Sequence, residues 1–274
     1  AMYFPLADGS RSQGSDTLTA HLLTLSHFMR QTDPRFTLPP AEQAQMQQAL
    51  IAFVTGKLQR TFWSPQQDMT ARKLSAIAAL ALDGKAAPAL LDSLDIDPVR
   101  WPTHSVLDWL TVLEHVQVPG RAQRQQEAWH ILRNRLAYQG TQVGFSTDAQ
   151  DHWWWLMQGP DVNAARLLLA TIGQAEWDAE RPRLVTGLLA RQKSGAWATT
   201  TANLWAGLAL RQFSSTYERD PVSGEAVYCT SDAAYSYIGN KTEALAGTSP
   251  RNLKVETVGD VLRGVDPAST VIAV

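Results

Sequence analysis

The stretch NAARLLLATI, at positions 163–172, is apolar on almost every side of a helix. A helix of this kind belongs inside a protein, because none of its faces suits contact with water. Around it, apolar residues recur every three or four positions, as at Leu18, Leu22 and Leu25, which is the spacing of one buried helix face. Alternation typical of strands is nearly absent before residue 215. The helical spacing predicts further helices near residues 46–58, 74–81, 106–113, 129–136, 184–189 and 204–213.

Residues that begin and end helices flank these stretches. Pro39 and Pro40 precede the second predicted helix, and proline suits the first helical turn because its missing N–H has no partner there anyway. Thr103 is the expected N-cap of the fourth. The helix that contains Leu136 is expected to stop before Gly140.

Short connectors rich in Gly, Pro and Asp separate the predicted helices, which favours antiparallel helical hairpins. Three connectors share an order: a Gln near a helix end, a turn, an aromatic residue and a new helix. This recurrence predicts a closed or curved stack of helix pairs, although a bundle that uses Gly and Trp at its turns would also produce it. The three are Gln59 with Phe62 and Trp63, Gln139 with Gly144 and Phe145, and Gln192 with Gly195 and Trp197. In the last of them, Trp197 is expected to plug the turn and Asn203 to hydrogen-bond at the helix start.

Composition excludes several classes of function. The chain has 274 residues, a formal charge of -2 and no basic block, so no electrostatic field draws it to nucleic acid or anionic lipid. Its single cysteine, Cys229, rules out a disulfide framework within the chain. No long uncharged apolar run suits a membrane span. The first residues do not resemble a signal peptide, and Ala1-Met2 resembles a start chosen in cloning, so we expect a fragment.

The character of the sequence changes after Tyr217. Residues 225–274 contain no Trp and show weak periodicity, with scattered Gly, Ser, Thr and Pro. We therefore expect two parts, a helical domain over 1–217 and an irregular or strand-containing tail, or the start of another domain, over 218–274. Short strands are expected at residues 227–228, 235–238 and 271–274.

Metal-binding and nucleophilic motifs are absent from the sequence. Zinc sites need clustered Cys, His or carboxylate ligands, and the six histidines are scattered, so each is interpreted as a packing or surface residue. Cys229 has no obvious histidine partner. No G-x-S-x-G motif or phosphate-binding glycine loop is present. We therefore predict no metal, cofactor or catalytic residue. The histidines are His21, His27, His104, His115, His130 and His152.

Acidic and aromatic residues supply the remaining candidates for chemistry. Asp148, Asp151 and Asp161 could act as paired acids of a glycosidase or as ligands of a diphosphate–magnesium site. Asp148 and Asp151, whose spacing of three is the one typical of a magnesium site, lie just before a predicted helix, and the favoured interpretation is that the helix dipole places negative charge there. The acids at 92, 95 and 97 suit a solvated connector. The triple tryptophan at 153–155 could stack on a sugar or an apolar ligand, but packing is the favoured interpretation.

Four stretches carry a resemblance to one family. They are GSDTLTAHLLTLS (14–26), WPTHSVLDWLTVL (101–113), WWWLMQGPDVNAARLLLAT (153–171) and GAWATTTANLWAGLAL (195–210). In this order they resemble the thioester domain of bacterial alpha-2-macroglobulins. The family's Cys-x-Glu-Gln motif is missing from the chain, since Glu42 and Gln43 have no cysteine before them. No catalytic residue is therefore carried over.

The resemblance implies an all-α fold, an alpha/alpha toroid of antiparallel helix pairs that is an incomplete six-hairpin barrel here. It implies a non-enzymatic, periplasmic inhibitor that traps attacking proteases, with those proteases and the other domains of the parent protein as partners, and no nucleic acid. Missing helices would expose apolar faces, so self-association is expected. The alternatives are a glycosidase-like or terpene-cyclase-like enzyme that uses acids at the toroid mouth, and a helical scaffold that binds a protein partner.

Overall fold

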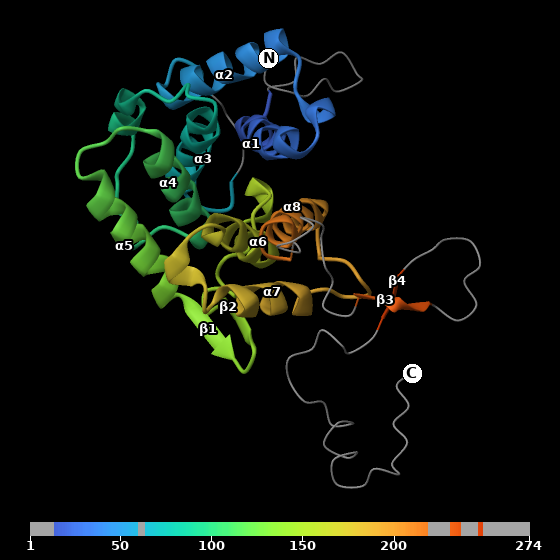
Figure 1. The fold of residues 1–274 in the computed structure, drawn as a ribbon. Coiled ribbons are helices and arrows are strands. Elements are labelled where there is room, and N and C mark those ends of the chain that lie inside the picture. The colour runs from blue at the N-terminus through green and yellow to red at the C-terminus, as the bar shows by residue number, and fades with distance from the viewer. Residues whose placement is uncertain (1–13, 60–63, 219–230, 237–245, 249–274) are drawn as a thin grey trace, which may run out of the picture. The chain divides into compact units, whose positions relative to one another are not determined.

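The computed structural model describes residues 14–59, 64–218, 231–236 and 246–248, and they are mostly helical (Figure 1). The chain divides into two compact units, residues 1–213 and 214–274. The helices are α1 (Asp16–Thr32), α2 (Pro40–Val54), α3 (Met69–Leu82), α4 (Thr103–His115), α5 (Arg121–Asn134), α6 (Pro160–Thr171), α7 (Arg181–Ala190) and α8 (Thr200–Tyr217). The strands are β1 (Leu136–Gln139), β2 (Gln142–Phe145), β3 (Ser231–Ser236) and β4 (Ala246–Thr248). Short 3-10 helices span Pro34–Phe36, Pro88–Ser93, Trp154–Leu156 and Ala175–Trp177.

The predicted helical fold is confirmed, and local sequence explains where several helices begin. The Ser15 hydroxyl accepts a hydrogen bond from the Leu18 backbone N–H at 3.2 Å and so caps α1. Proline occupies the first turn of α2, α6 and α7. The Thr199 hydroxyl accepts from the Ala202 N–H at 3.1 Å at the start of α8. The Ser15 and Thr199 hydroxyls satisfy backbone donors that a helix cannot satisfy itself, and proline in the first turn has no such donor.

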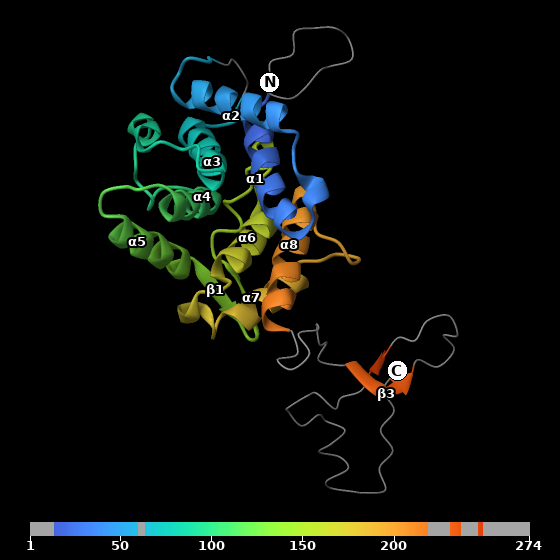
Figure 2. The same ribbon diagram turned by 45° about the horizontal axis from the view of Figure 1, so that its top comes forward.

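Helices α2, α5 and α7 pack on the outside of the first unit (Figure 1). Helix α2 packs against α1 and α3, α5 against α4, and α7 against α6. Figure 2 also shows α2 and α5 at the periphery, with α1 and α6 between the other helices. Helix α6 is buried along most of its length, and Ala165, Leu167 and Leu168 are fully inaccessible, which confirms the expectation from its apolar sequence.

A β-hairpin corrects one predicted helix. Helix α5 ends at Asn134, and Leu136 begins β1, which pairs antiparallel with β2. The turn between the strands contains Gly140 at a φ of 59°, a conformation that favours glycine. Val143 and Phe145 are buried on one side of β2 because α7 packs against this strand. The sequence, in which strand alternation is nearly absent before residue 215, did not predict this hairpin. A hairpin this short is not stable alone and depends on its packing against α7.

The start of α4 also differs from the prediction. Thr103 is the first helical residue rather than the N-cap, and Pro102 precedes it without a capping side chain. The Thr103 backbone N–H instead donates to Oδ1 of Asp151 at 3.3 Å. A carboxylate from a distant connector thus caps this helix, and sequence spacing alone gives no indication of that pairing.

A buried carboxylate joins the first three helices. Asp83, at the end of α3, accepts hydrogen bonds from Arg30 at 2.7 Å, and from Gln43 at 2.7 Å and Gln47 at 3.0 Å. His27 lies 3.3 Å from the same carboxylate. Burial opposes ionisation, but the hydrogen bonds from His27 and Gln43 and the charge of Arg30 lower the pKa of Asp83 to about 2. The carboxylate therefore stays ionised and holds α1 and α2 to the end of α3.

The second unit contains the antiparallel pair of β3 and β4. The strand predicted at 235–238 overlaps the end of β3 at residues 235–236. The strands predicted at 227–228 and 271–274, together with Cys229, lie outside the described residues. So do Phe62 and Trp63 of the first predicted connector.

The connector before α8 bears out the role predicted for Asn203. Its side-chain oxygen accepts from the Trp197 backbone N–H at 3.2 Å, and its Nδ2 donates to the Trp197 and Thr199 carbonyls at 2.9 and 2.7 Å. The half-buried Trp197 ring packs on the core, and its Nε1 donates to the Leu188 carbonyl at 2.9 Å. The side chains of Asn203 and Trp197 thus both hold this turn in place.

Gly187 marks a contact where α7 touches β2 without room for a side chain. A Cβ at this position would lie 2.0 Å from the Val143 carbonyl oxygen. We expect Gly187→Ala to lower the free energy of unfolding by about 2–3 kcal/mol, because backbone must move to relieve the clash. Gly207→Ala is the control: a Cβ there meets nothing within 4 Å, so the change should stabilise α8 by about 0.5–1 kcal/mol. Urea denaturation measures both, and equal effects would contradict the assigned contact.

Trp197 and Trp154 form a second matched pair. Trp197→Ala removes core packing and the hydrogen bond to Leu188, so we expect a loss of about 2–4 kcal/mol. Trp154 is 70% exposed, and Trp154→Ala should cost less than about 0.5 kcal/mol. Thermal melting of the two variants checks the difference. A melting temperature unchanged by Trp197→Ala would disprove the plugging role.

Candidate functional site

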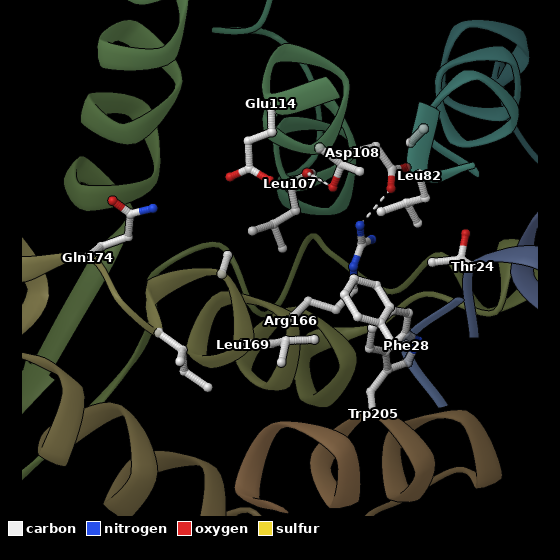
Figure 3. Close-up of a pocket in the computed structure, with 14 residues that line it drawn as sticks. Thr24, Phe28, Leu82, Leu107, Asp108, Glu114, Arg166, Leu169, Gln174 and Trp205 are labelled. Atoms are coloured by element: carbon white, nitrogen blue, oxygen red, sulfur yellow. Dashed lines mark hydrogen bonds and ion pairs between the residues drawn. The ribbon is translucent and has the colours of Figure 1, made fainter. Parts of the chain in front are cut away.

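A recessed cavity of about 350 Å³ lies among five helices of the first unit (Figure 3). We call α1, α3, α4, α6 and α8 the inner helices, because each contributes side chains to its wall. The polar lining comes mainly from α4 and α6. The labelled lining residues are Thr24, Phe28, Leu82, Leu107, Asp108, Glu114, Arg166, Leu169, Gln174 and Trp205.

The cavity borders corresponding parts of four inner helices. The cavity meets the later turns of α1, α3, α4 and α6, as shown by Phe28, Leu82, Glu114 and Leu169. A separate groove is lined by the first residues of both α6 and α8, so these two helices begin near each other. Contacts connect α1 to α3, α3 to α4 and α4 to α6, and Trp205 of α8 stacks edge-on with Phe28 of α1 at 5.7 Å. The inner helices therefore follow one another around the cavity.

A buried ion pair forms part of the cavity floor. Arg166 Nη2 donates to Oδ1 of Asp108 at 2.6 Å, and the two residues are only 8% and 4% exposed. The guanidinium carbon also lies 5.4 Å from the centre of the Trp205 ring, within range of a cation–π interaction. Burial raises the pKa of Asp108, although the charge and hydrogen bond of Arg166 act in the opposite direction.

Two buried histidines lie near this pair. Burial, and secondarily the charge of Arg166, lowers the pKa of His21 to about 4 and that of His104 to about 3. His21 contacts the Trp205 ring edge-on at 6.2 Å, and His104 contacts Trp153 at 5.3 Å. Both imidazoles are therefore neutral at pH 7. The prediction that they serve packing agrees with this placement.

The interior around Arg166 holds polar atoms without hydrogen-bond partners among the described residues. They come from α1, α4, α6 and α8, and the residues that carry them are all at least nine-tenths buried. Buried polar atoms are nearly always hydrogen-bonded in proteins, so this interior has capacity for an additional polar molecule. The atoms are His21 Nε2, both ring nitrogens of His104, Ser105 Oγ, Asp108 Oδ2, both amide atoms of Asn163, and Trp205 Nε1.

The three acids considered for catalysis lie elsewhere. None lines the central cavity. Asp151 is 3% exposed and accepts from Thr147 Oγ1 at 2.8 Å as well as from Thr103, so it does cap a helix, but α4 rather than the next helix in the chain. Asp148 and Asp161 meet at Arg191, which pairs with Asp148 and lies 3.3 Å from Asp161. All three carboxylates are thus engaged in structural contacts.

Sequence reasoning overlooked Asp108, Glu114 and Arg166, which line the cavity. One signal was available: Arg166 is the only charged residue within an otherwise apolar run of α6, and a buried charge requires a partner. Nothing in the spacing identified Asp108 as that partner, because the pair joins two helices 58 residues apart.

The remaining histidines and the triple tryptophan can also be placed. His115, His130 and His152 are exposed, which agrees with a surface role, and the described residues contain no group of three potential metal ligands. Trp155 donates to Asp68 at 2.9 Å, and its ring lies 5.2 Å from that of Trp153. These two rings therefore serve packing, as expected, whereas Trp154 is 70% exposed and contacts the Trp155 ring edge-on at 5.9 Å.

Comparison with known proteins gives one relevant structural match. No protein-family model matches the sequence, and a search of curated proteins finds none that does. Among solved structures, alpha-2-macroglobulin of E. coli in its native conformation matches 77% of this chain with a TM-score of 0.53 and 17% sequence identity. The chain spans 12% of that protein's length. At this identity, the likeness extends to the helical fold.

No helix among the described residues has the length and apolar character needed to cross a membrane. The candidate site is a recess among helices of the first unit, lined by one buried ion pair and by an acidic residue, Glu114, at an exposed position of its wall.

The buried histidines predict how stability depends on pH. Their folded pKa values lie below the usual 6.5, so the unfolded chain binds protons first as pH falls. Stability should therefore decrease between pH 6.5 and about 4, by on the order of 3 kcal/mol for a fully shifted histidine. Replacing His21 should flatten the slope of unfolding free energy against pH between 7 and 5. His21→Gln is compared with His130→Gln on the surface, and identical slopes would contradict the assigned burial.

Proposed function

We propose that residues 1–217 are a truncated alpha/alpha toroid domain of a bacterial alpha-2-macroglobulin-like protein that traps attacking proteases, without catalytic turnover of its own. Residues 218–274 would be an irregular tail or the start of a following domain. One observation carries the proposal: 77% of the chain superimposes on part of E. coli alpha-2-macroglobulin, whose family the four sequence stretches also resemble.

The arrangement of the helices supports a toroid. The inner helices follow one another around a cavity, while α2, α5 and α7 pack outside them. Each outer helix lies next to an inner helix that adjoins it in sequence, which is the arrangement of stacked helical hairpins. A barrel of six hairpins would need helices beyond those described, so the proposed domain is incomplete.

The contacts of the predicted acids favour a structural role. Asp151 caps α4, and Asp148 and Asp161 share Arg191. A general acid or base must be able to reach its substrate and change its protonation state, whereas these carboxylates are occupied by hydrogen bonds and ion pairs. A trapping domain needs a stable scaffold rather than free acids.

The proposal also covers location and partners. A protein of this kind would act in the periplasm on proteases that enter it, and this domain would contact other domains of the same protein. If helices are missing from the barrel, their apolar contact faces would favour self-association of the isolated chain.

An enzymatic function is the second candidate, and one observation favours it. Asp108 has a raised pKa and lines a cavity beside Arg166, a combination frequent at catalytic sites. It would place the acids of a toroid enzyme at Asp108 and Glu114 rather than at the three aspartates first considered.

Protease trapping is tested on the full-length gene product that contains this chain. After incubation with trypsin, activity on a large substrate such as casein should fall at least tenfold, while activity on a small chromogenic peptide persists. Such a split arises when a protease is enclosed but its active site stays open. Undiminished cleavage of casein would contradict the proposal.

The enzymatic alternative is tested by substitution. If the protein hydrolyses a glycoside, Asp108→Asn or Glu114→Gln should lower kcat by at least about a hundredfold. Asp95→Asn, on an exposed connector, is the control. Turnover that depends on either cavity acid would replace the trapping proposal with an enzyme.

A further inference from the structure

The cavity among the inner helices carries excess negative charge. Asp108 and Arg166 neutralise each other at 2.6 Å, which leaves Glu114 without a compensating cation among the residues that line the wall. The last turns of α3 and α4 hold Leu82 and Glu114, and the carbonyl ends of helices add partial negative charge. A monovalent cation would therefore bring the net charge of the lining to zero.

One carboxylate oxygen of Asp108 can also accept a further hydrogen bond. Only its Oδ1 accepts from Arg166, while Oδ2 has no hydrogen-bond partner among the described residues. The residue is 4% exposed and lines the cavity. A buried carboxylate oxygen without a donor costs free energy, so a donor group at this part of the wall would be favoured. This unpaired acceptor is an observation separate from the net charge of the lining.

The rest of the wall is apolar and aromatic. Phe28 and Trp205 stand edge-to-face at 5.7 Å, and Leu82, Leu107 and Leu169 also face the cavity (Figure 3). Its volume of about 350 Å³ suits a small molecule rather than a protein surface. The ligand that fits has an apolar body and one positively charged donor group.

We propose that this cavity binds a small organic monocation, an alkyl- or arylalkylammonium compound, with the ammonium group held by Glu114 and Asp108 and its hydrocarbon part against Phe28, Trp205 and the leucines. Ammonium donates three hydrogen bonds, which matches the free acceptors of the two carboxylates. Arg166 stays paired with Asp108 Oδ1 and keeps that carboxylate in place. This inference does not depend on protease trapping, since it concerns residues without a part in that proposal.

The test uses the full chain and benzylammonium, with benzyl alcohol and benzoate as neutral and anionic analogues of the same size. Isothermal titration calorimetry at low salt and pH 7.5 should show binding of benzylammonium at a 1:1 ratio. Benzyl alcohol and benzoate should bind at least about tenfold more weakly, because each lacks the charge that the carboxylates attract.

Substitutions then locate the site. Glu114 is exposed, so Glu114→Gln should fold normally and weaken benzylammonium binding at least about fivefold. Glu127→Gln, on the exposed side of α5 and outside the cavity lining, should leave the affinity unchanged. Asp108→Asn should weaken binding as well, and a melting curve establishes whether that variant folds.

Three results would overturn the inference. One is the absence of binding at millimolar benzylammonium. Another is equal affinity for benzyl alcohol, which would show a merely apolar pocket. The third is an affinity unaffected by Glu114→Gln, which would place any binding elsewhere on the chain. None of these results bears on trapping of trypsin by the full-length protein, so the two proposals fail separately.

Discussion

Arg166 is a guanidinium buried among five helices, and the packing around it has to compensate for its lost hydration. Asp108 supplies the opposite charge, and Trp205 lies 5.4 Å from the guanidinium carbon. Removing one member of a buried pair leaves an uncompensated charge, which destabilises a protein far more than exchanging both members. The pair therefore links α4 to α6, and through Trp205 to α8. A shift of these helices along one another would break this pair.

Buried charged groups with fixed partners also join the helices at the edges of the helical unit. Asp83 collects donors from α1 and α2 at the end of α3, and Asp151 caps α4 from a distant connector. Arg72 of α3 donates to Asp68 at 2.8 Å and to Asp16 of α1 at 3.2 Å, in surroundings where all three are less than 9% exposed. An apolar stripe determines which side of a helix is buried. It does not determine which helix packs there, or how far the two helices are displaced along their axes. Buried polar contacts of fixed geometry supply that information.

Scaffold and cavity have different chemical character. The three acids that first suggested catalysis hold connectors and helix ends in place, whereas the acids at the cavity are part of helix α4, with Glu114 in its last turn. Under the two proposals made above, this separation would let a protease-trapping scaffold also contain a recess for a small ligand. The likeness to E. coli alpha-2-macroglobulin concerns the path of the backbone, while the ligand proposal rests on side chains particular to this sequence.

The sequence by itself determined the helices, because their apolar spacing is a local property that any single helix displays. It also determined the buried position of α6 and the role of Asn203, whose hydrogen bonds reach residues only 4 and 6 positions away. Only the tertiary structure decided the β1–β2 hairpin, since that hairpin depends on α7, and the cap of α4, since Asp151 lies 48 residues from Thr103. The cavity belongs to the second group as well: its wall comes from five helices, and no pattern within one helix specifies which side chains the others place opposite it.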